Sequence, residues 1–93
     1  MQFVLIIHEV ADYLAWKIGF DKAANIRKEA GELSYQVLVD NKAPNKVMHF
    51  SRWKSHELAK AFFESDKVKA IRKKLGVQQP DFIYLNELES GIL

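Results

Sequence analysis

Two segments of this sequence are predicted to be β-strands with apolar residues on both faces. In residues 3–10 (FVLIIHEV) and 33–40 (LSYQVLVD), β-branched, aromatic and aliphatic side chains occupy odd and even positions alike. Side chains alternate between the two faces of a strand, so a sheet built from these segments needs cover on both sides. A sheet covered on one side only normally has a polar second face.

The residues between these two strands have the pattern of a helix. Asp12 stands at the N-cap position, and apolar residues then recur at intervals of three and four. Gly31 follows the last of them, where a left-handed C-terminal cap is common. The sequence therefore predicts one helix between Asp12 and Gly31.

The second half of the chain repeats this order. The turn-forming cluster NKAPNK precedes a predicted third strand over residues 47–53 (VMHFSRW), which should pair with the second strand as an antiparallel hairpin. Ser55 is placed to cap a second helix that runs to Leu75, and Ser65 with Asp66 can break or restart it. A fourth strand is predicted after Pro80, over residues 82–89.

The resulting order, βαββαβ, predicts an α+β fold of the ferredoxin-like type. Two right-handed crossovers around one hairpin give a four-stranded antiparallel sheet with two helices on one face. The chain of 93 residues is expected to form a single domain over 1–93. Because its own helices cover only one face of the sheet, a second copy of the chain is the simplest cover for the other, which predicts a homodimer.

Composition excludes several classes of protein. The chain has no cysteine, so we expect neither disulfides nor a thiolate nucleophile. No apolar run approaches the roughly 20 residues of a membrane-spanning helix, and the short apolar start lacks the features of a signal peptide, so a cytoplasmic protein without membrane contact is expected. Five cations fall within DKVKAIRKK, but helical spacing of its apolar residues turns them to solvent, so we expect no nucleic-acid partner.

The quoted segments, together with PNKVMHFSRWKSHELAKAFFES, resemble the antibiotic biosynthesis monooxygenase-like domains of the dimeric α/β-barrel superfamily. The resemblance covers nearly the whole chain. It implies two sheets that close face to face into a barrel, and a pocket in each subunit between helices and sheet. It also implies one of several activities: oxygenases that work without metal or flavin on phenolic polycyclic compounds, haem-degrading enzymes, isomerases, or no reaction at all.

The resemblance transfers to individual residues as follows. Trp53 fits the Trp that the family often has at the end of the third strand. The haem-degrading members use an Asn on the first strand, which FVLIIHEV lacks, and a His on the second helix, where this chain has Phe62. The resemblance therefore implies no haem, and we expect no cofactor.

His8 and His49 are the candidate catalytic residues. They lie on the first and third strands, which are neighbours in this fold, so the two imidazoles could lie close together. An imidazole that titrates near neutrality suits a general base acting on a phenol or a carbon acid. The alternative is that each is a strand histidine satisfied by one hydrogen bond. We expect no metal site, because two histidines without further ligands are too few.

Five aromatic residues are candidates for the wall of a pocket that binds a flat aromatic molecule: Trp53, Trp16, Tyr13, Tyr35 and Phe62. The alternative is that they are core residues, which is favoured for Trp16 and Phe62 because both fall on apolar helical stripes. Arg27 falls on such a stripe too, where its side chain could meet a ligand carboxylate or extend outward to solvent, and the second is favoured. Arg52, of opposite parity to Trp53, is expected at a subunit interface or in solvent.

Two functions are compatible with these observations. The first is a small cofactor-independent oxygenase or isomerase acting on an aromatic or enolisable compound, with His49 as base and Trp53 as wall. The second is a non-catalytic dimeric protein of the same fold that binds a small ligand or serves as an accessory protein. A base inside a concave site would favour the first.

Overall fold

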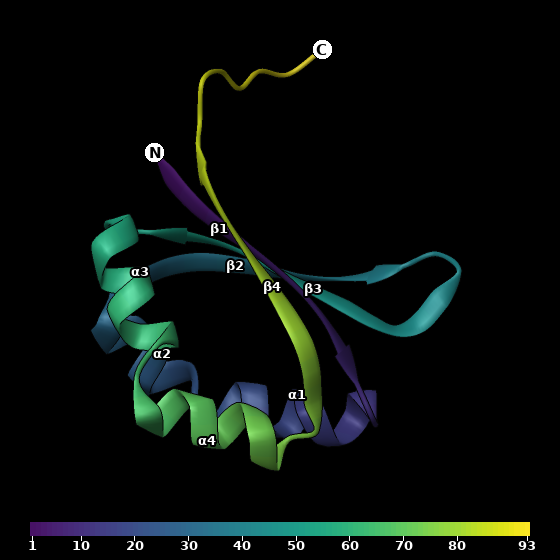
Figure 1. The fold of residues 1–93 in the computed structure, drawn as a ribbon. Helices are drawn as coiled ribbons and strands as arrows, with labels where there is room; N and C mark the ends of the chain where they lie inside the picture. Colours follow the sequence, from purple (N-terminus) through teal and green to yellow (C-terminus); the bar gives the residue numbers. More distant parts are fainter.

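A computed structural model describes residues 1–93, apart from the side chain of Gln79. Its four strands are β1 (Gln2–Val10), β2 (Glu32–Asp40), β3 (Ala43–Trp53) and β4 (Val77–Asn86). They form one antiparallel sheet in the order β2-β3-β1-β4 (Figure 1). The predicted βαββαβ order and the α+β ferredoxin-like architecture are confirmed.

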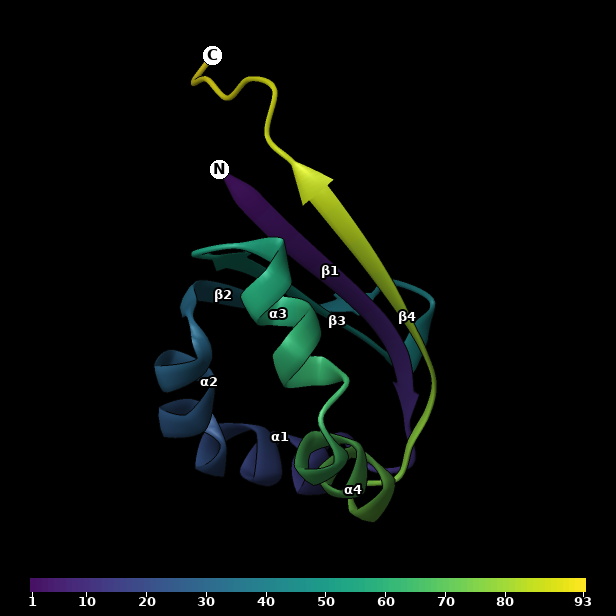
Figure 2. The same ribbon diagram turned by 60° about the vertical axis from the view of Figure 1, so that its left-hand side comes forward.

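Four short helices pack on one face of this sheet, as Figures 1 and 2 show: α1 (Tyr13–Lys22), α2 (Ala24–Ala30), α3 (His56–Phe63) and α4 (Asp66–Lys74). Each of the two predicted helices is thus divided. Ser65 restarts the second one as expected, since its hydroxyl accepts a hydrogen bond from the Val68 N–H. The break at Ala23, which lies between α1 and α2, was not predicted.

Two strand boundaries differ from the prediction. The hairpin turn consists of Asn41 and Lys42 only, so that β3 begins at Ala43 instead of at residue 47. The Asp40 carboxylate stabilises this tight turn by accepting the Lys42 N–H at 2.7 Å. Strand β4 spans 77–86 instead of 82–89, and it tolerates Pro80 because it lies at the edge of the sheet.

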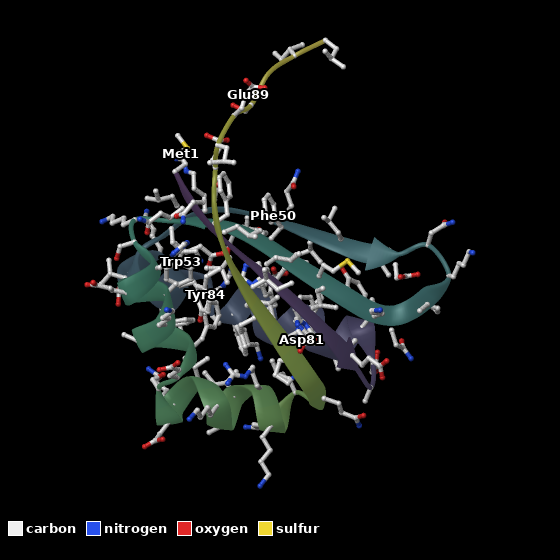
Figure 3. The ribbon with its side chains drawn as sticks, turned by 45° about the horizontal axis from the view of Figure 1, so that its top comes forward. Met1, Phe50, Trp53, Asp81, Tyr84 and Glu89 are labelled. Atoms are coloured by element: carbon white, nitrogen blue, oxygen red, sulfur yellow. The ribbon has the colours of Figure 1, made fainter. Side chains whose placement is uncertain are left out.

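The helix-covered face of the sheet carries the core. Val4 and Ile6 pack with Trp53, Ala59, Phe63 and Val68, while Val10 and Val47 pack with Trp16 and Phe20. Strand parity therefore places the helix-facing residues as the sequence predicts. In Figure 3, Trp53 and Tyr84 lie on this side of the sheet and Phe50 on the other.

The opposite face, here called the open face, carries apolar side chains with no helix over them. Its members are Phe3, Leu5 and Ile7 of β1, Leu38 of β2, Met48 and Phe50 of β3, and Ile83 and Leu85 of β4. The rings of Phe3 and Phe50 stack at 5.1 Å between centroids. Beyond β4, residues 87–93 extend away from the body of the domain (Figure 1), with Leu88, Ile92 and Leu93 fully exposed. None of the helices in the described chain is both long and apolar enough to traverse a bilayer.

Candidate functional site

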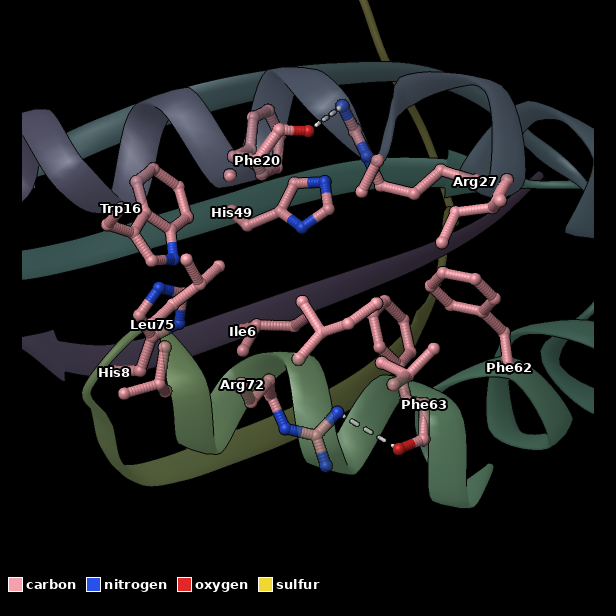
Figure 4. Close-up of a pocket in the computed structure, with 16 residues that line it drawn as sticks. Ile6, His8, Trp16, Phe20, Arg27, His49, Phe62, Phe63, Arg72 and Leu75 are labelled. Atoms are coloured by element: carbon pink, nitrogen blue, oxygen red, sulfur yellow. Dashed lines mark hydrogen bonds between the residues drawn. The ribbon is translucent and has the colours of Figure 1, made fainter.

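A cavity of about 80 Å³ lies between the helices and the covered face of the sheet (Figure 4). The sheet contributes residues from β1, β3 and β4, and all four helices contribute residues from the other side. The side chains that define its chemistry are Ile6, His8, Trp16, Phe20, Arg27, His49, Phe62, Phe63, Arg72 and Leu75. Its walls are mainly aromatic and aliphatic, with a few polar groups among them, which is the usual composition of a small-ligand site.

His49 is buried and is held by a carboxylate. Its Nε2 lies 2.7 Å from Oε2 of Glu32. Because an ionised carboxylate only accepts hydrogen bonds, this contact assigns the ring proton to Nε2. Nδ1 points toward the interior of the cavity in Figure 4, and in the tautomer with its proton on Nε2 this atom carries a lone pair. The arrangement suits a base whose orientation is fixed by its second nitrogen.

Glu32 and Arg27 form a buried ion pair behind His49. Arg27 Nη1 donates to Glu32 Oε1 at 2.9 Å, and Nη2 donates to the Phe20 carbonyl at 3.2 Å. The guanidinium also lies over the Phe20 ring, 3.7 Å from its centroid. The prediction that Arg27 extends outward was wrong, since these inward partners satisfy a charge that would otherwise need water.

Glu32 was missed by the sequence reasoning for a geometric reason. By simple alternation it lies on the parity of Ser34, which pairs with Arg52 and faces away from the helices. The register of β2 shifts between Glu32 and Ser34, so that Glu32 pairs with Trp53 and turns to the helix-covered side, where it contacts Arg27 and His49. A β-bulge of this kind redirects a side chain and leaves little trace in a single sequence.

His8 lies beside His49 on the neighbouring strand. In the β1–β3 register, Ile6 faces His49 and His8 faces Val47, so the two histidines are diagonal neighbours on the helix-covered face. His8 is buried against Trp16, with ring centroids 5.2 Å apart. Among the described side chains, neither ring nitrogen of His8 has a hydrogen-bond partner. His49 therefore matches the interpretation of a histidine with one partner, whereas His8 does not.

The environment of His8 favours the neutral ring. Burial first, and then the nearby His49 and Arg72, together lower its pKa from 6.5 to about 4. Arg72 comes from α4, where its Nη1 donates to the Phe63 carbonyl at 3.0 Å. At neutral pH His8 thus offers one N–H donor and one acceptor nitrogen inside the cavity.

This lowered pKa predicts an acid-dependent loss of stability. The unfolded chain binds a proton at His8 with a pKa near 6.5, and the folded protein only near 4. Between these values the unfolded state holds more protons, so the free energy of unfolding falls as the pH drops from 6.5 to 4, by up to about 3 kcal/mol. Urea denaturation at a series of pH values measures the slope. In His8→Phe this part of the slope should disappear, and an unchanged slope would contradict the assignment.

The five predicted wall residues are only partly brought together. Trp16 and Phe62 line the cavity, whereas Trp53, Tyr13 and Tyr35 are absent from its lining. Trp53 is packed in the core and donates its Nε1–H to the Ser51 hydroxyl at 2.8 Å. Trp53 and His49 lie on the same face of the sheet, as predicted. The cavity wall, however, is formed by Phe20 and Phe63 and not by Trp53.

Tyr13 and Tyr35 lie at the margins of the site. Tyr13 packs on Trp16 at 5.9 Å between centroids, on the far side from the cavity lining. Tyr35 is half exposed and stands 4.9 Å from the Arg27 guanidinium, edge-on to Phe20. It therefore covers the ion pair from the solvent side instead of lining the cavity.

The size of the cavity limits what it can hold without rearrangement. An engineered apolar cavity of about 150 Å³ is known to hold benzene, and the cavity here is about 80 Å³. An aromatic ligand, even one of a single ring, therefore requires movement of side chains or helices. Within the described part of the chain, no group of three or more His, Cys, Asp or Glu is arranged to hold a metal ion.

Comparison with known proteins places this geometry in context. A family model described as antibiotic biosynthesis monooxygenase matches residues 18–74. No curated protein matches the chain.

Solved structures that resemble the chain cover almost all of it. A presumed antibiotic biosynthesis monooxygenase from Deinococcus radiodurans has 17% identity, covers 100% of this chain and 98% of its own, and gives a TM-score of 0.71. A presumed monooxygenase of the same kind from Caulobacter crescentus CB15 has 21% identity, with 95% and 90% covered and a TM-score of 0.72. SnoaB, a cofactor-independent oxygenase from Streptomyces nogalater, has 11% identity, with 96% and 93% covered and a TM-score of 0.74. At these identities the likeness shows a shared fold.

Proposed function

The chain belongs to the antibiotic biosynthesis monooxygenase family, and from this premise we propose that it is a small cofactor-independent oxygenase or isomerase acting on an aromatic or enolisable compound. One observation carries the proposal. The Nδ1 of His49 faces an apolar cavity while Glu32 holds the opposite nitrogen. A base oriented in this way, within a site that excludes water, is what proton abstraction from a phenol or a carbon acid requires.

The proposed first step transfers a proton from the substrate to His49 Nδ1. The positive charge that forms on the ring is balanced by the Glu32 carboxylate, which accepts the Nε2–H. Arg27 fixes the position of that carboxylate from behind. The substrate, now an anion, either passes electrons to O₂, as in an oxygenase, or takes the proton back at another carbon, as in an isomerase.

The second candidate is a dimeric protein that binds a small ligand without turnover. The observation that favours it is the ion-pair array itself. Arg27, Glu32 and His49 join α2, β2 and β3 through buried contacts, an arrangement that also serves a purely structural purpose. The two candidates differ in whether His49 is needed for more than the stability of the fold.

His49→Gln separates these roles. The Gln amide can still donate to Glu32, but it lacks a basic nitrogen toward the cavity. We expect turnover to fall at least about 100-fold, the usual contribution of a general base, with little change in stability. Two assays measure it: O₂ uptake with tricyclic phenols of the anthrone type, and solvent deuterium incorporation into small β-dicarbonyl compounds.

His56→Gln is the matched control, because His56 is the third histidine of the chain and is absent from the cavity lining. It should keep full activity. If native protein is inactive in both assays yet binds one of these compounds, the binding candidate replaces the enzyme. If His49→Gln retains native turnover, His49 is not the base.

We further propose that the protein works as a homodimer built on the open face. Eight apolar side chains from all four strands lie there, and several are half buried while others are more than one-third exposed. A continuous apolar face of this kind is typical of an interface between subunits. The C-terminal segment, with Leu88, Ile92 and Leu93 exposed, extends beyond the end of β4 (Figure 1). We propose that a partner subunit meets these side chains too.

A further inference from the structure

His8 is a polar side chain that lines the cavity and has no role in the proposed proton transfer. Its side chain is 5% exposed, and among the described residues neither ring nitrogen has a partner. Buried polar groups in folded proteins nearly always have one, so an exception inside a cavity needs a reason. A ligand group that completes its hydrogen bonds provides that reason.

The surroundings of His8 specify the sign of that ligand group. The ring is neutral at physiological pH, so it keeps one N–H donor. Arg72 and the imidazole of His49 both lie near enough to lower its pKa, and the Glu32 carboxylate is engaged with Arg27 and His49. This side of the cavity therefore favours an oxygen that carries or develops negative charge.

The spacing of the two histidines matches an enolisable group. Diagonal neighbours on adjacent strands have Cβ atoms about 7–8 Å apart at most, and His8 and His49 are such neighbours. A carbonyl oxygen and the acidic C–H of the adjacent carbon are separated by only two bonds. One histidine ring can therefore contact the oxygen while the other contacts the hydrogen. Both rings lie on the side of the cavity formed by the sheet (Figure 4).

We propose that His8 determines substrate specificity by donating a hydrogen bond from its neutral imidazole to the carbonyl or phenolic oxygen of the substrate. This inference rests on the proposed function, since the oxygen is the one that becomes negative when His49 removes the proton. No covalent bond of His8 forms or breaks in this step, because the proton moves from the substrate to His49. The proposed substrates are therefore compounds in which a carbon that bears an oxygen is bonded to the atom that loses the proton.

The test uses two ligands of equal shape, cyclopentanone and methylenecyclopentane. They differ in C=O against C=CH₂, and the ketone can only accept hydrogen bonds, so the lone pair of His49 gives it no advantage. Both are titrated into the full-length protein, with ¹⁵N-labelled histidine rings observed by NMR. We expect the ketone to bind at least about tenfold more tightly and to shift the His8 ring nitrogens.

Variants of His8 and of a distant histidine assign the preference. In His8→Phe the two ligands should bind equally, whereas His8→Gln, which retains an N–H donor, should restore part of the preference. His56→Gln should behave as native. The inference is overturned if the native protein does not prefer the ketone, if neither ligand binds, or if the preference survives in His8→Phe. None of these measurements needs turnover, so this inference and the proposed reaction can fail separately.

Discussion

Glu32→Leu is expected to lower the free energy of unfolding by about 3–5 kcal/mol, the usual cost of removing one partner from a buried ion pair. The Arg27 guanidinium would lose its carboxylate while remaining buried, with only the Phe20 carbonyl as hydrogen-bond partner. His49 would lose the acceptor for its Nε2–H at the same time. Urea denaturation followed by circular dichroism measures the change.

The double variant Arg27→Met with Glu32→Leu is the control that isolates the charge. It should be more stable than Glu32→Leu alone, because no uncompensated charge remains in the core. Asp21→Asn tests an exposed pair for comparison: Lys17 and Asp21 contact each other at 2.6 Å on the surface of α1, where solvent screens the charges, and we expect little or no change in stability. A Glu32→Leu variant as stable as the native protein would contradict the buried pairing.

The sheet could be predicted from the sequence because strand parity is a strict rule. It placed His8, His49 and Trp53 on one face, and the structure confirms that placement. It also indicated that Phe3, Leu5 and Ile7 need cover that the chain's own helices do not supply. Helix caps at Asp12, Ser55 and Gly31 were equally local and equally predictable.

The composition of the site could not be predicted to the same degree. Glu32 turns to the helix-covered side through an irregularity in strand register, and there it meets Arg27, which lines the cavity from α2. Both depend on tertiary packing, which single-sequence periodicity does not encode. The same holds for the aromatic wall: Trp53 and Phe20 are both buried, and only the packing of the helices decides which of them borders the cavity.

Leu5→Asp and Val37→Asp are expected to fail in different ways, because the two residues lie on opposite faces of the sheet. The native protein should sediment at about twice the chain mass of 10.8 kDa. Leu5 belongs to the open face, opposite Phe50 and Ile83. A charge there would be buried without a partner in the dimer, so Leu5→Asp should weaken association at least about 100-fold, equivalent to about 3 kcal/mol.

Val37 pairs with His49 and packs against the core under the helices. A carboxylate at this position would therefore be opposed by the subunit's own core, and Val37→Asp should lower the melting temperature whether or not the dimer forms. Sedimentation equilibrium and thermal denaturation, measured on both variants, separate the two effects. A folded native monomer at micromolar concentration would refute the homodimer. If Leu5→Asp dissociates and unfolds together, with no folded monomer between the two states, the open face is needed for folding. The subunit then has no stability apart from its partner.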